Sequence, residues 1–166
     1  MGRLSVRGWA WVVVWLVCSG GAATAEESGG VAPEEGGGIH AAVEAVLRVQ
    51  EEAWNRGDID AFMEHYWKSD DLTFSSGGKT TRGWQATLAG YRERYPTRET
   101  MGRLTLSGLE ITPLGDETLQ DGAALVLGQW KLDRQSEPVG GNFTLVFRKI
   151  DGRWVIVHDH TSRLAE

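Results

Sequence analysis

The chain has 166 residues, enough for one domain with a hydrophobic core, and its 17 Lys and Arg against 23 Asp and Glu give a net charge of −6. This acidic balance argues against nucleic acid and anionic membranes as partners, because both attract basic surfaces. The single cysteine, Cys18, lies in an N-terminal apolar segment, so the rest of the chain has neither a disulfide nor a thiol nucleophile.

The N-terminus is predicted to be an export signal, residues 1–25. Arg3 and Arg7 precede an uncharged apolar run at 9–17, and the small-x-small sequence of a signal-peptidase site follows at 23–25. The run is short for a bilayer span, and a retained membrane anchor is the alternative. Cleavage would remove two of the 17 basic residues, leaving 15 against 23 acidic ones and a formal charge of −8. The sequence therefore predicts a periplasmic or secreted protein.

A linker and a helix follow the predicted signal. Residues 26–38 are acidic and rich in glycine, and we expect them to be a disordered linker. Residues 39–56 carry apolar side chains at helical spacing, which predicts an amphipathic helix. Its core-facing stripe consists of Val43, Val46, Leu47, Gln50, Ala53 and Trp54. The folded domain is predicted to extend from residue 39 to residue 164.

Two further helices and a short strand are predicted next. Gly57 is placed to end the first helix, and Asp58 to cap a short second one. Residues 72–75 have the composition of a short strand. A third helix is expected to begin at Gly83 and to end before Pro96.

The chain after Gly102 is predicted to be β-structure. Four strand candidates, separated by turn residues, occupy 104–113, 123–134, 141–150 and 154–162. Helices followed by a run of antiparallel strands are typical of an α+β domain. We expect three N-terminal helices to cover one face of a curved antiparallel sheet, since neither layer can bury its apolar side chains alone.

The last predicted strand becomes polar toward its end. Strict alternation would place Trp154, Ile156, His158, His160 and Ser162 on one face and Val155, Val157, Asp159 and Thr161 on the other. Both faces begin with apolar residues, so both are expected to be covered for part of their length. The polar end is either a site or the place where the strand meets water.

Three segments resemble the nuclear transport factor 2-like superfamily. They are residues 55–60, the helix start at Gly83-Trp84, and residues 143–162 with the core Asp-Gly-x-Trp-x-Ile-Val-His-x-His-x-Ser. The similarity covers 39–163 and points to SnoaL-like and ketosteroid isomerase-like domains and to the association domain of calcium/calmodulin-dependent protein kinase II. The resemblance implies a cone-shaped, cystatin-like α+β roll with a pocket at its open end. It implies no one reaction, because the fold hosts isomerases, cyclases, dehydratases, transport factors and assembly hubs.

The resemblance to the kinase association domain also implies which strand residues face the pocket. The inward residues would be Gln129, Leu145, Val157, Asp159 and Thr161, and the outward ones His158, His160 and Ser162. The kinase domain carries arginines at the positions that match Gln129, Leu145 and Thr161. Their absence here argues against an anionic ligand held in that way.

Asp159 is the predicted catalytic candidate. An apolar pocket around it would be lined by Trp54, Tyr66, Phe74, Trp84 and Tyr91. Loss of solvent in such a pocket would raise the pKa of the Asp159 carboxyl and suit it to proton transfer. The alternative is a structural carboxylate that is hydrogen-bonded to a neighbouring side chain.

Two histidines and a serine on the last strand are weaker candidates. His158 and His160 have the spacing of two metal ligands on one strand face, but further ligands are lacking, so neither a metal nor a cofactor is predicted. Hydrogen bonds to a neighbouring strand, or a dimer contact, are the alternative roles for the histidines. Ser162 is interpreted as a hydroxyl that caps the backbone.

Three functions remain open from the sequence. The first is an exported domain that binds a small apolar or partly polar molecule and forms a homodimer through its sheet. The second is an isomerase, dehydratase or cyclase that uses Asp159 as acid and base without a cofactor. The third is an oligomeric assembly module in which the pocket is vestigial. None of them involves nucleic acid, or a membrane once the signal has been removed.

Overall fold

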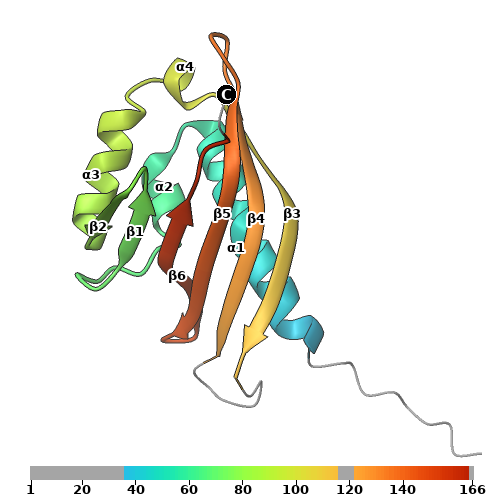
Figure 1. Cartoon of the computed structure of the whole chain (residues 1–166). Coiled ribbons are helices and arrows are strands. Elements are labelled where there is room, and N and C mark those ends of the chain that lie inside the picture. The colour runs from blue at the N-terminus through green and yellow to red at the C-terminus, as the bar shows by residue number, and fades with distance from the viewer. Residues whose placement is uncertain (1–35, 116–121, 165–166) are drawn as a thin grey trace, which may run out of the picture. The chain divides into compact units, whose positions relative to one another are not determined.

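A computed structural model describes residues 36–115 and 122–164, so the predicted signal and most of the predicted linker lie outside the described residues. Figure 1 shows helices first and a large sheet after them. The elements are α1 (Gly36–Arg56), α2 (Ile59–Met63), β1 (Thr73–Ser76), β2 (Lys79–Arg82), α3 (Trp84–Arg94), α4 (Arg98–Met101), β3 (Arg103–Leu114), β4 (Ala123–Asp133), β5 (Val139–Ile150) and β6 (Arg153–Thr161). No helix within these ranges is long and apolar enough to cross a bilayer.

The sheet has six strands in the order β2-β1-β6-β5-β4-β3, which confirms the predicted α+β class. Strands β3 to β6 form the predicted antiparallel run, with β4 and β5 at its centre. The exception to the predicted antiparallel sheet is β1, which pairs with β6 in parallel. Hydrophobic alternation predicts which residues form a strand but not the direction in which the strand enters a sheet, so this parallel pairing could not be predicted from the pattern.

Local signals explain the helical layer. The predicted stripe of α1 is buried except for the partly buried Val46. Gly57 ends α1 with a positive φ of 84°, and the carboxylate of Asp58 accepts a hydrogen bond from the Ala61 amide at 2.9 Å. Sequence reasoning missed the single turn of α4, which begins with a capping box between Thr97 and Thr100.

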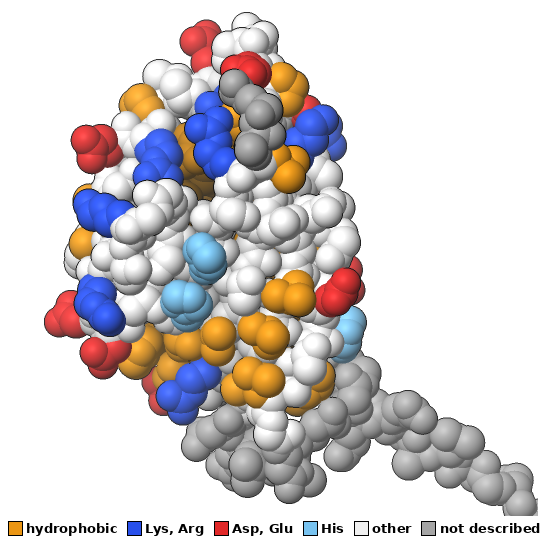
Figure 2. Space-filling view, viewed as in Figure 1, with side chains coloured by type: hydrophobic (Ala, Val, Ile, Leu, Met, Phe, Trp, Pro, Cys, Tyr) orange, Lys and Arg blue, Asp and Glu red, His pale blue; other side chains and the backbone are white. Residues whose placement is uncertain are grey.

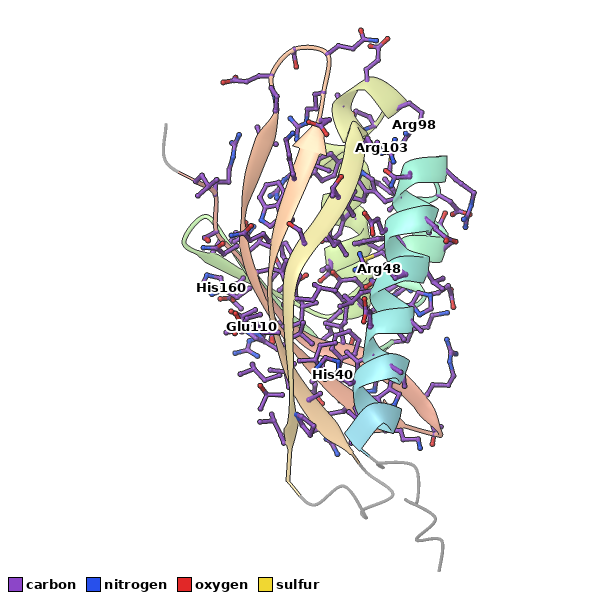
Figure 3. The ribbon with its side chains drawn as sticks, turned by 90° about the vertical axis from the view of Figure 1, so that its right-hand side faces the viewer. His40, Arg48, Arg98, Arg103, Glu110 and His160 are labelled. Carbon is purple, nitrogen blue, oxygen red and sulfur yellow. The ribbon has the colours of Figure 1, made fainter. Side chains whose placement is uncertain are left out.

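Helix α1 lies along one face of the sheet and is fixed to its edge strand. Figure 3 shows α1 beside β3, with His160 and Glu110 on the side of the sheet away from α1. The side-chain amide of Asn55 both donates to the Leu104 carbonyl at 2.9 Å and accepts from the Leu104 amide at 2.8 Å. This pairing extends the hydrogen bonding of β3 onto the helix and sets the separation of the two layers.

Two β-bulges bend the sheet around the helices. One interrupts the β3–β4 register between Ser107 and Glu110, where Gly108 takes a positive φ of 59°. The other lies between β5 and β6, where Val146 pairs with His158 but Phe147 pairs with Ile156, leaving Val157 as the extra residue. A bulge of this kind shifts the alternation by one residue. The inner face of β6 therefore carries Ile156 and then Asp159, which corrects the strict alternation expected from the sequence.

The packed core occupies one end of the inner face. Its largest fully buried side chains are Phe147, Leu47, Met63, Leu72, Ile156, Val43 and Val126. Beyond them, toward the other end of β5 and β6, the inward residues Leu145, Phe143 and Thr161 line a cavity, and Leu145 and Phe143 are at the same time buried members of the core. The curvature that the bulges produce leaves this end of the sheet open.

Candidate functional site

The cavity between the helices and the open end of the sheet has a volume of about 580 Å³. Residues from every layer line it, including Trp54 of α1, Phe62 of α2, Tyr91 of α3 and Leu145 of β5. Figure 2 shows a hollow in the upper part of this face, between Lys and Arg side chains. The wall combines many aromatic and aliphatic side chains with a set of polar and charged ones, so it can contact both the apolar and the polar parts of a small molecule.

One side of the cavity is an aromatic wall, made of Trp54, Phe62, Tyr66, Phe74, Tyr91 and Tyr95. The rings contact one another edge to face or tilted, except for Tyr91 and Tyr95, which are stacked. Trp54 lies 4.8 Å from Tyr95 and 5.3 Å from Phe62 between ring centroids, and Phe74 lies 5.6 Å from Tyr91. Such contacts fix the rings to one another. The wall is therefore rigid, because α1, α2, α3 and β1 all contribute to it.

Asp159 lies in the wall of the cavity beside two tyrosines. Its side chain is buried, and the Tyr66 hydroxyl donates to Asp159 Oδ2 at 2.7 Å. The hydroxyls of Tyr66 and Tyr91 are 3.5 Å apart. The β6 bulge turns Asp159 inward, and the segment after α2 places Tyr66 next to it, because Tyr66 forms a bridge with Ile156 of the same strand.

Burial changes the acidity of this cluster. Loss of solvent raises the pKa of Asp159 from 3.8 to about 7, although the hydrogen bond from Tyr66 opposes the rise. Burial and the nearby Asp159 charge raise the pKa of Tyr66 and of Tyr91 well above their usual 10, so both hydroxyls stay protonated. At neutral pH the carboxyl of Asp159 is therefore divided between its neutral and ionised forms. A group of this kind can either donate or accept a proton.

Three buried side-chain atoms within the described ranges have no hydrogen-bond partner: Trp54 Nε1, Arg134 Nε and Asp159 Oδ1. All three residues line the cavity. Buried polar atoms are almost always paired, and each exception calls for an explanation. The three residues therefore border one cavity, although the three unpaired atoms themselves are closed off from solvent.

The predicted site residues divide into two groups. Those that line the cavity are Asp159, Trp54, Tyr66, Phe74, Tyr91, Leu145 and Thr161. Trp84, Gln129 and Val157 do not line it, contrary to expectation. The Trp84 indole donates to the Met63 carbonyl at 2.9 Å, Gln129 is exposed because Trp130 is the inward residue of β4, and Val157 is the bulge residue.

Sequence reasoning missed several residues that contribute to the site. Gln50 was identified only as part of the α1 stripe, yet its buried amide lines the cavity and donates to the Phe62 carbonyl at 3.1 Å. A polar side chain within an apolar stripe was the available signal. Four cations, Lys79, Arg94, Arg134 and Arg163, also line the cavity, and no local pattern connects them.

The other candidates on the last strand have structural contacts. His158 Nδ1 and Thr73 Oγ1 are 2.6 Å apart, which connects β6 to β1. His160 is exposed, and the Ser162 hydroxyl donates to the Asn142 carbonyl at 3.4 Å. Within the described ranges there is no group of three or more His, Cys, Asp and Glu side chains that could hold a metal ion.

A curved mixed sheet closed over N-terminal helices is the arrangement of nuclear transport factor 2-like, or cystatin-like, folds. The chain belongs to the SnoaL-like domain family, whose family model matches residues 43–166. It is similar to a nuclear transport factor 2-like protein of unknown function from Shewanella oneidensis MR-1, with 43% identity over 75% of this chain and 98% of that one and a TM-score of 0.69.

Two more distant structures share the fold alone. A nuclear transport factor 2-like protein of unknown function from Pseudomonas putida KT2440 has 18% identity over 78% of this chain and 89% of that one, with a TM-score of 0.61. A putative calcium/calmodulin-dependent protein kinase II association domain from Xanthomonas campestris has 17% identity over 75% of this chain and 86% of that one, with a TM-score of 0.57. No curated protein matches the chain.

Proposed function

We propose that this SnoaL-like domain binds a small, mainly apolar molecule in the cavity. The observation that supports the proposal is the concentration of the unpaired buried atoms of Trp54, Arg134 and Asp159 around one space of about 580 Å³. An aromatic wall would bury the body of the ligand, and the unpaired indole and carboxyl groups would orient it.

Native mass spectrometry of the protein purified from its own host tests this proposal. The wild type is expected to retain a small molecule that is released on denaturation. Leu145→Trp places a large ring into the cavity and is expected to abolish retention, whereas Val49→Trp, at an exposed position of α1 outside the cavity, is the matched control. Equal retention by wild type and Leu145→Trp, with both folded, would show that the molecule binds elsewhere.

A second candidate function is proton transfer by Asp159, as in an isomerase or lyase without a cofactor. It is favoured by the raised pKa of about 7, by the place of Asp159 among the residues that line the cavity, and by the lack of a hydrogen-bond partner for Oδ1. The ionised carboxylate would accept a proton from carbon next to a carbonyl and return it at a different carbon. The Tyr66 hydroxyl would hold Oδ2 and leave Oδ1 for the substrate.

Deuterium incorporation into simple unsaturated ketones, followed by NMR in D₂O, tests this chemistry. Asp159→Asn keeps the shape of the side chain but cannot accept a proton, so exchange should fall by about 100-fold or more. Asp159→Glu should restore part of the rate. Exchange that is unchanged in Asp159→Asn would exclude Asp159 as the base and would leave the binding proposal intact.

Export and dimer formation are parts of the same proposal. The N-terminal sequence supports export, and detection of a mature N-terminus near residue 26 in the periplasm would test it. Leu114 and Leu127, 44% and 41% exposed, support a contact through the outer face of the sheet. Light scattering should therefore give a dimer for the wild type and a monomer for Leu127→Lys, and a monomeric wild type would refute the dimer.

A further inference from the structure

The cavity has an asymmetric charge distribution from its mouth to its interior. Of the residues that line it, the exposed ones are Gly77, Lys79, Arg94 and Arg163, so three of the four residues at the mouth are cations. The half-buried Arg134 is a fourth lining cation. The acid among the lining residues is the buried Asp159. This local excess of positive charge occurs in a chain whose net charge is −6.

The four cations are not used in ion pairs of the fold. Within the described ranges, ion pairs involve Arg48, Arg56, Lys68, Arg92 and Lys131, and none involves Lys79, Arg94, Arg134 or Arg163. Arg92 and Arg94 make the contrast clear, since both lie near the end of α3. Arg92 contacts Asp60 at 2.6 Å, whereas Arg94 lines the cavity. Clustered like charges without acids repel one another, so an anion would stabilise them.

Arg134 connects this positive mouth to the aromatic wall. Its guanidinium carbon lies 5.8 Å from the centre of the Tyr95 ring, and its buried Nε has no partner. From Tyr95 the wall continues inward through Tyr91 and Tyr66, with ring centroids 6.1 and 6.5 Å apart, and ends at Asp159. An apolar body that lies along these rings would have its outer end beside Arg134.

We propose that the cavity selects amphipathic organic anions, with an apolar or aromatic body along the aromatic wall and one carboxylate or sulfonate at the cationic mouth. This inference rests on the proposed binding function and adds the chemical class and the orientation of the ligand. The acid group faces outward because ionised Asp159 would repel an anion at the inner end. These cations differ from the positions that match the kinase association domain, so the mode of anion binding differs as well.

A matched pair of fluorescent probes tests the inference. The probe 1-anilinonaphthalene-8-sulfonate is an anion, and N-phenyl-1-naphthylamine has the same aromatic body without the sulfonate. The wild type is expected to bind the sulfonate more tightly, and the preference should decrease with added salt. Each exposed cation is expected to contribute about threefold to the sulfonate affinity, so the double variant Arg94→Gln/Arg163→Gln should weaken sulfonate binding by about tenfold. The affinity for the neutral probe should not change.

Arg92→Gln is the matched control, because it removes a charge from the same helix outside the cavity, and its sulfonate affinity should equal that of the wild type.

The two levels of the proposal can fail separately. If the neutral probe binds but the sulfonate is not preferred, the anion inference is wrong and the binding function stands. If Leu145→Trp reduces the binding of neither probe, the probes do not occupy the cavity and the binding function itself is wrong. A preference that survives in the double variant would also overturn the role of these arginines.

Discussion

The two ends of the β5–β6 strand pair face the same helical layer but are built differently. At one end Phe147 and Ile156 are fully buried within the packed core. At the other end, the next inward residues, Leu145 and Asp159, border an unfilled cavity. The packed end maximises apolar burial, at about 1.5 to 3 kcal/mol for each large side chain. The cavity end, called the hollow end below, keeps a desolvated carboxyl group whose ionisation lowers stability, and a local cost of this kind is typical of a functional site.

Truncation of the packed end should have the largest effect on the fold. Phe147→Ala removes a ring that is 0% exposed and leaves a cavity where none exists. We expect the free energy of unfolding to fall by about 4 kcal/mol, measured by urea denaturation. The matched variant at the hollow end is Phe74→Ala, whose half-buried ring borders the cavity and should lose about half as much. Equal losses at the two positions would remove the energetic distinction between the ends.

Asp159→Asn tests the energetic cost of the hollow end. Folding raises the pKa of the Asp159 carboxyl from 3.8 to about 7. The folded state therefore holds more protons than the unfolded state between these pH values, and its stability falls as the pH rises through this window. The full penalty is present above pH 7, and a difference of about three pKa units corresponds to about 4 kcal/mol. A neutral amide has no such penalty.

The asparagine variant should thus be more stable than the wild type at pH 8, by up to about 4 kcal/mol, and by much less at pH 4. Urea denaturation across this pH range measures both values. The control is Asp58→Asn, since asparagine also caps helices and the Asp58 side chain is exposed, so its stability should follow the wild type. A gain for Asp159→Asn that does not depend on pH would mean that Asp159 has an ordinary acidity.

Much of the fold could be predicted because its signals are local. The stripe of α1, the glycine-aspartate corner at 57–58 and the Asp151-Gly152 hairpin each depend on residues close together in the chain. The parallel pairing of β1 with β6 could not be predicted in the same way, because it joins segments about eighty residues apart. The overall arrangement of a curved sheet around the helices was predicted from the resemblance to a known family and not from local signals.

The site was predicted less completely than the fold. Asp159 was selected because the last strand becomes polar toward its end, and Tyr66 as one of the aromatic residues expected around it. Val157 was expected to line the pocket but is the extra residue of the β6 bulge. No residue in that valine- and isoleucine-rich strand indicates a bulge. The cations at the mouth, such as Arg94 and Arg163, come from distant segments that only the tertiary fold brings together. A basic cluster of this kind has no signature in the sequence.

Enlarging one leucine at each end should sharpen the comparison. Leu72 is 0% exposed and belongs to the packed core, so Leu72→Trp should lower the free energy of unfolding by about 3 kcal/mol through overpacking. Leu145→Trp can extend into the cavity and should lower it by about 1 kcal/mol or less. Thermal unfolding of both variants measures the difference. A large loss in Leu145→Trp would indicate that the cavity wall cannot accept a ring from that position.

Tyr66→Phe should have a small effect on stability and the most specific effect on the site. The Tyr66 hydroxyl donates to Asp159 Oδ2 at 2.7 Å and holds the pKa of Asp159 lower than burial alone would. Its removal should therefore raise the pKa of Asp159 further, and should lower stability by about 1 kcal/mol. NMR titration of the Asp159 carboxyl carbon measures the shift directly. Tyr91→Phe is the matched control, because the Tyr91 hydroxyl contacts Tyr66 at 3.5 Å and has no hydrogen bond to Asp159. A comparable rise of the Asp159 pKa in Tyr91→Phe would show that burial, and not the hydrogen bond from Tyr66, determines this pKa.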